Sequence, residues 1–160
     1  MKIKVTKKII ICNLLLLVIG LGSCTSLLKS TIKEDGRQIP TNFGKSKTTI
    51  LVVKHGIKRE SKALDKSWAK YYKGDYIFVK SEEIKDAKYN DLTNFQYIFD
   101  DVERSFTTSD NKHLGAASFY MYDRKEGRNY SLNAESGLYS TLLKAYIIKL
   151  EQVRTKNSKK

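Results

Sequence analysis

The stretch Thr-Thr-Ile-Leu-Val-Val-Lys-His, residues 48–55, decides how the fold of this chain is predicted. Four apolar residues stand together in it, three of them β-branched, and Gly56 follows the stretch directly. Such an uninterrupted run is typical of a strand buried on both faces, and strands of that kind belong to sheets covered by helices. The stretch therefore predicts an α/β or α+β domain.

Further elements follow this strand at short spacing. A helix over 60–73 is predicted because Leu64, Trp68, Tyr71 and Tyr72 form one apolar stripe. Strands are expected at 75–80, 95–100, 116–123 and 129–133, a short helix from Ser81, and a last helix over 136–153. The polar loop between the last two strands suits an antiparallel hairpin, whereas helical connections between the first three strands favour parallel pairing.

The order of these elements is strand, helix, strand, helix, strand, strand, strand, helix. It predicts a mixed sheet of about five strands with helices packed on it. The order loosely resembles a thioredoxin-like core, but the redox Cys-x-x-Cys motif is missing. A chain of 160 residues with 41% hydrophobic residues has enough apolar material for one globular domain.

The N-terminus has the charge order of an export signal. Four lysines precede an apolar stretch from Ile9 to Gly22, and no acidic residue occurs before Glu34. The stretch is shorter than the roughly 20 residues that span a bilayer. It ends in Leu21-Gly22-Ser23-Cys24, which resembles the lipobox of bacterial lipoproteins. The resemblance implies cleavage before Cys24, attachment of a diacylglycerol to its thiol, and usually acylation of the new amino group.

We therefore divide the chain into four parts: a cleaved lipoprotein signal peptide over 1–23, a lipidated N-terminus and flexible tether over 24–47, a single globular domain over 48–153, and a basic tail over 154–160 that is expected to fray. With Cys12 removed and Cys24 lipidated, the mature chain has no free thiol, which excludes disulfides and thiol nucleophiles. The expected location is the cell envelope, at the outer membrane if the cell is Gram-negative, with the domain on the extracytoplasmic side.

Few polar residues are candidates for chemistry. They are His55 and His113, with Asp110 near the latter, and the carboxylates Asp100, Asp101 and Glu103 after the third predicted strand. Their spacing matches no recurring metal-ligand or catalytic motif, so we expect isolated histidines and a solvated strand end, without a cofactor or a metal site. The alternative is a small periplasmic hydrolase or metal-dependent enzyme in which His55, His113 and Asp101 converge.

The net charge of +13 first suggests a nucleic acid or an anionic membrane as partner. The basic residues concentrate on the first predicted helix, where Lys58, Lys62, Lys66 and Lys70 recur every fourth residue opposite the apolar stripe. Residues 54–73 hold seven bases and two acids, whereas 82–104 hold seven acids and three bases. Such a dipolar domain favours docking in one orientation over uniform binding of a polyanion.

The predicted hairpin offers a second candidate surface, formed by Tyr120, Tyr122, Arg124 and Arg128. Tyrosine and arginine are favoured at the hot spots of protein interfaces. The sequence thus predicts a lipid-anchored, non-catalytic binding or envelope-assembly component. Its expected partners are the membrane, through the lipid, and an anionic headgroup or an envelope protein, and no nucleic acid.

Overall fold

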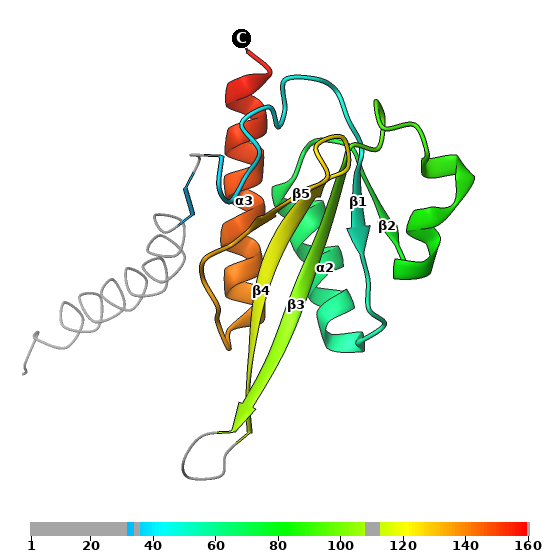
Figure 1. Ribbon diagram of the computed structural model, residues 1–160. Coiled ribbons are helices and arrows are strands. Elements are labelled where there is room, and N and C mark those ends of the chain that lie inside the picture. Colours follow the sequence, from blue (N-terminus) through cyan, green and yellow to red (C-terminus); the bar gives the residue numbers. More distant parts are fainter. Residues whose placement is uncertain (1–31, 34–35, 108–112, 160) are drawn as a thin grey trace, which may run out of the picture.

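A computed structural model of the protein describes residues 32–33, 36–107 and 113–159 (Figure 1). The predicted signal and Cys24 lie outside these residues. No helix among the described residues is long and apolar enough to cross a membrane. The elements are, in chain order, β1 (Ile50–Val53), α2 (Lys58–Tyr71), β2 (Tyr76–Val79), the short 3-10 helices η1 (Ser81–Lys85) and η2 (Ala87–Tyr89), β3 (Tyr97–Thr107), β4 (His113–Asp123), β5 (Arg128–Ser131) and α3 (Tyr139–Asn157).

The five strands form one mixed sheet in the order β2-β1-β3-β4-β5. β1 pairs in parallel with both β2 and β3, and β4 is antiparallel to β3 and to β5. This confirms the predicted α/β class, the mixed sheet of five strands and the hairpin. β3 and β4 are eleven residues each and extend as a two-stranded ribbon past the end of β1 and away from the body (Figure 1).

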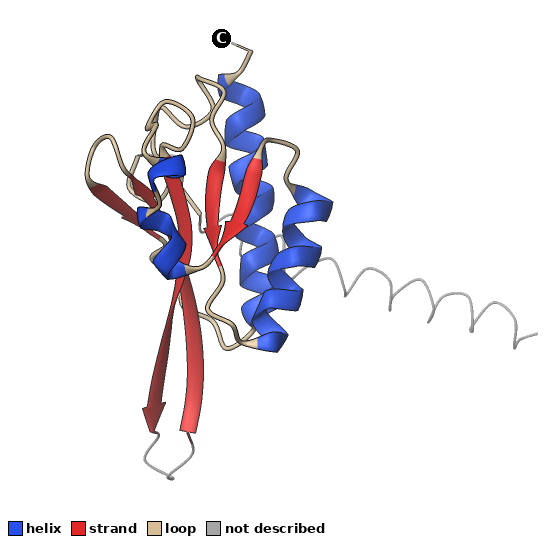
Figure 2. Cartoon of the chain, turned by 90° about the vertical axis from the view of Figure 1, so that its right-hand side faces the viewer, coloured by secondary structure: helices blue, strands red, loops and turns tan. Residues whose placement is uncertain are grey.

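Helices α2 and α3 cover one face of the sheet (Figure 2). Trp68 of α2 is fully buried, with its ring centroid 5.1 Å from that of Phe99 on β3, and Phe99 in turn lies 5.7 Å from Tyr146 of α3. Burial of each such side chain contributes roughly 1.5–3 kcal/mol. This aromatic cluster fixes both helices to the centre of the sheet.

The opposite face of the sheet carries a smaller core under η1 and η2 (Figure 2). Leu51 and Val53 of β1 pack there with Val79, Tyr89 and Ile98. Ile50 and Val52, the alternate residues of β1, point into the larger core on the helical side. β1 is therefore buried on both faces, as its continuous apolar run predicts.

The prediction of a flexible tether over 24–47 is wrong for the second half of this range. Ile32, Ile39 and Phe43 are 2%, 1% and 1% exposed and belong to the main core. The Tyr146 hydroxyl donates a hydrogen bond of 2.9 Å to the backbone carbonyl of Gln38, which ties this segment to α3. The three apolar residues are spaced too widely to show a periodicity, so composition alone suggested a linker.

The predicted fraying of residues 154–160 is also wrong for their first part, because α3 continues to Asn157. The Arg154 guanidinium donates two hydrogen bonds, of 2.6 and 2.8 Å, to the carboxylate of Glu151. The Asn157 amide donates to the backbone carbonyl of Phe43 at 2.7 Å. The end of α3 and the N-terminal segment thus hold each other in place.

Candidate functional site

A polar junction of the sheet lies at the carboxyl end of β1. From this end the chain leaves through α2 toward β2, whereas the neighbouring strand β3 runs on into the ribbon with β4. Open α/β sheets bind ligands where adjacent strands part in this way. Val52 pairs with Phe99, so the residues that follow Phe99 lie beside the end of β1.

Three side chains meet at this junction: His55, Asp100 and Asp101. His55 Nε2 lies 2.6 Å from Asp100 Oδ1, and one ligand atom from each of the three residues lies within 4.8 Å of the others. The Tyr120 hydroxyl donates to Asp100 Oδ2 at 2.9 Å, and the backbone N–H of Asp101 donates to Asp100 Oδ1 at 2.8 Å. Both oxygens of Asp100 are therefore held in fixed positions.

The electrostatics of the junction favour positive charge on the imidazole. Partial burial lowers the pKa of His55, but the hydrogen bond that His55 donates to Asp100 and the charges of Asp100, Asp101 and Glu60 outweigh it, and the pKa is raised. Burial, together with the hydrogen bond to Asp100, raises the pKa of Tyr120 above its ordinary value. Tyr120 is therefore a neutral hydrogen-bond donor at neutral pH.

The alternative in which His55, His113 and Asp101 converge is excluded for His113. In the strand register, Asp101 pairs with Phe119 and Thr107 pairs with His113, six residues further along β4. At about 3.3 Å per residue this is roughly 20 Å, far beyond hydrogen-bond reach. Asp110 lies outside the described residues. Asp100, Asp101 and Glu103 stand within β3 and not at its end.

The four lysines of the predicted basic face lie where the sequence places them. Lys58, Lys62, Lys66 and Lys70 are all exposed on α2, while Leu64 and Trp68 on its other side are buried. Among the described residues, no carboxylate forms an ion pair with Lys58, Lys62 or Lys66, and Lys70 Nζ lies 5.4 Å from the centre of the Tyr71 ring. Of the two acids on α2, Glu60 and Asp65, the latter is paired with Lys54 at 2.5 Å.

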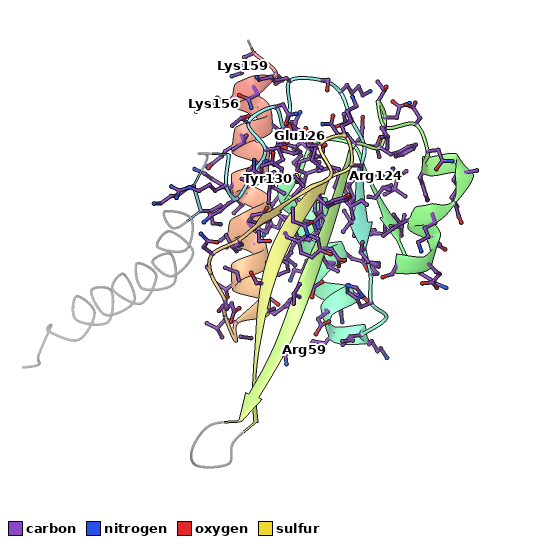
Figure 3. All side chains as sticks on the ribbon, in the orientation of Figure 1. Arg59, Arg124, Glu126, Tyr130, Lys156 and Lys159 are labelled. Carbon is purple, nitrogen blue, oxygen red and sulfur yellow. The ribbon has the colours of Figure 1, made fainter. Side chains whose placement is uncertain are left out.

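The tyrosines and arginines of the hairpin are used largely inside the fold. Tyr120 bonds Asp100, Tyr122 packs against the smaller core, and the Arg124 guanidinium donates to the carbonyls of Tyr89 and Phe95 at 2.6 and 2.9 Å. Figure 3 shows Arg124 with Glu126 and Tyr130 at the β4–β5 turn. Of the four candidate residues only Arg128 is exposed, so the hairpin does not form the exposed Tyr and Arg surface that was predicted.

A cavity of about 410 Å³ lies at the other end of β1 and collects further cations. Lys45, Lys47, Lys73 and Arg154 line it. Two of them are already paired, because Lys47 lies 3.4 Å from Asp75 and Arg154 binds Glu151. The cavity is therefore a weaker candidate for an anion site than its count of basic residues suggests.

Sequence reasoning named all three residues of the junction, but it joined His55 with Asp101 only in an alternative that also required His113. It did not bring Asp100 to His55, and it missed the role of Tyr120. The missing information is the strand register, which places Asp100 opposite Tyr120 on β4 and next to the end of β1. Comparison of the chain with models of known protein families, with curated proteins and with solved structures found no match.

Proposed function

We propose that this protein is an exported lipoprotein, anchored through Cys24, whose domain is a non-catalytic binding or envelope-assembly component held close to the membrane. The observation that carries the proposal is the burial of Ile32, eight residues after the lipobox-like cysteine. Eight residues span at most about 29 Å, whereas the 24 residues of the tether first expected would reach roughly 80 Å. A domain on the shorter anchor stays beside the bilayer.

The surface best suited to contact that bilayer is the lysine face of α2. Its four lysines are exposed, and each lysine near an anionic lipid surface contributes about 1 kcal/mol. Like charges at this spacing repel one another by a few tenths of a kcal/mol per pair, so the row does not stabilise the helix itself. The four lysines together contribute about 4 kcal/mol to the free energy of membrane binding, which is weak alone. A lipid anchor, however, keeps the lysine face at a high local concentration near the membrane.

The anchor is tested by replacing the cysteine. Cys24→Ser is expected to leave the precursor uncleaved and to abolish labelling by radioactive fatty acid, since the thiol is the acceptor. Cys12→Ser, the matched control within the apolar stretch, is expected to leave both unchanged. Normal cleavage of Cys24→Ser would contradict the lipoprotein assignment.

The lysine face is tested without the lipid, on the chain from Thr25 onwards. The triple variant with Lys62, Lys66 and Lys70 changed to Glu is expected to bind vesicles rich in phosphatidylglycerol about 100-fold more weakly, given about 1 kcal/mol per lysine. The control changes three exposed lysines elsewhere, Lys85, Lys88 and Lys125, to Glu and so alters the net charge equally. Equal losses in both variants would remove the α2 face from the proposal.

A further inference from the structure

We propose that His55, Asp100 and Asp101 form a binding site for a first-row divalent metal ion at the carboxyl end of β1. This revises the expectation, from the sequence, of no metal site. The inference does not depend on the lipid anchor or on the lysine face. It rests on the distances between three ligand atoms, on the groups that hold them and on the position of the cluster in the sheet.

The distances suit a small cation. Zn²⁺ binds imidazole nitrogen and carboxylate oxygen at about 2.0–2.2 Å, so two ligands of a tetrahedral ion lie roughly 3.4 Å apart. In the cluster His55 Nε2 and Asp100 Oδ1 are 2.6 Å apart, and one ligand atom of each residue lies within 4.8 Å of the others. The three atoms are thus close enough to converge on one ion once the direct contact between His55 and Asp100 opens to about 3.4 Å.

The carboxylates are positioned as metal ligands usually are. Asp100 and Asp101 are consecutive residues of β3, a strand paired with β4 along its whole length, and Asp101 is only 9% exposed. The Tyr120 hydroxyl binds the second oxygen of Asp100, which orients the first toward His55. Hydrogen bonds of this kind to a ligand are characteristic of metal sites and fix ligand geometry.

The ligand set indicates the class of metal. One imidazole with two carboxylates suits Zn²⁺ or Mn²⁺, whereas Ca²⁺ and Mg²⁺ prefer oxygen ligands alone. The His55 side chain is 38% exposed, so an ion can enter from solvent and keep at least one position for water or for an anionic group of a partner. A bound ion would also join the end of β1 to β3.

The test uses the full chain in nonionic detergent with both cysteines changed to serine, because free thiols would bind zinc. Isothermal titration with Zn²⁺ is expected to give one site per chain in this protein. His55→Ala is expected to weaken binding by more than tenfold, and Tyr120→Phe by about 10–100-fold as for other groups that orient a ligand. His113→Ala is the matched control, because this second histidine lies six residues further along β4 and is expected to have no effect.

Three further measurements keep the proposal falsifiable if a variant folds poorly. Zinc is expected to shift the ring-nitrogen NMR signals of His55 in the chain that retains both histidines, and Co²⁺ is expected to show the intense visible bands of tetrahedral coordination. Ca²⁺ is expected to bind at least tenfold more weakly than Zn²⁺. The proposal is overturned if His113→Ala weakens binding as much as His55→Ala, if zinc leaves the His55 signals unchanged, or if His55→Ala binds zinc normally.

Discussion

Replacement of Phe43 by alanine tests whether the segment before β1 belongs to the fold. The Phe43 side chain is 1% exposed and packs edge to face on Tyr97, with ring centroids 5.3 Å apart. Buried Phe→Ala changes cost about 3–5 kcal/mol, of which an aromatic pair contributes about 0.5–1.5 kcal/mol. We expect a loss of about 4 kcal/mol, whereas the same change in an exposed linker would cost less than about 0.5 kcal/mol.

The measurement is urea unfolding of the detergent-solubilised full chain, followed through the fluorescence of Trp68. This residue is the only tryptophan and is fully buried, so its emission reports the main core. With a denaturant slope of about 2 kcal/mol/M, the midpoint is expected to fall by roughly 2 M. Lys45→Ala, at an exposed position two residues away, is the control. A midpoint for Phe43→Ala within about 0.3 M of the control would refute the packing of this segment.

Two further predictions concern α3, first at its contact with this segment and then at the Glu151–Arg154 pair within it. Gly44 and Gly56 both have positive φ, of 82° and 81°, but a Cβ at Gly44 would lie 2.5 Å from the Cα of Arg154 and one at Gly56 would meet nothing within 4 Å. Gly56→Ala is therefore expected to lower the free energy of unfolding by about 1–2 kcal/mol, for the backbone conformation alone. Gly44→Ala is expected to lower it clearly more in the same urea assay, and equal losses would contradict the close approach of Gly44 to Arg154. The pKa of Glu151 is lowered because hydrogen bonds and charge from Arg154 outweigh the opposing effect of burial. The contribution of Glu151 to the free energy of unfolding is thus complete above the ordinary glutamate pKa and is lost as pH falls through the lowered pKa of the folded protein. The difference in free energy of unfolding between wild type and Glu151→Gln is therefore expected to narrow at acidic pH. A difference that stays constant with pH would exclude this linkage.

The sequence was sufficient for the elements that bury continuous or periodic apolar patterns. β1 is four apolar residues buried on both faces, and α2 places Leu64 and Trp68 on one side and its lysines on the other. It was insufficient where burial depends on distant partners. Ile39 and Phe43 are buried because α3 passes over them, and β3 continues past Asp100 because β4 pairs with it, and neither partner is visible in the local pattern.

The candidate site likewise combines residues that the sequence shows with contacts that depend on distant partners. The sequence allowed His55 and Asp101 to meet only as an alternative, because both were expected at strand ends. Whether they approach each other depends on the register in which Val52 pairs with Phe99. A shift of one residue would turn Asp100 and Asp101 to the opposite faces of the sheet, since side chains alternate along a strand. His113 was included because its polar stretch could form a loop over the same edge of the sheet, but the length of the ribbon places it far away.

Attachment of a lipid at Cys24, as proposed above, would limit which side of the domain can face the bilayer. The described chain begins at Ile32, which is buried in the main core with residues of α3. A domain of this length has a diameter of roughly 36 Å, or about 55 Å for half of its circumference. An eight-residue anchor reaches about 29 Å, so it could not turn the side opposite Ile32 toward the membrane. α2 lies next to α3 in the helical layer (Figure 2). The proposed anchor would therefore keep the lysine face of α2 within reach of the membrane, whereas a freely turning domain on a 24-residue tether would have no preferred side.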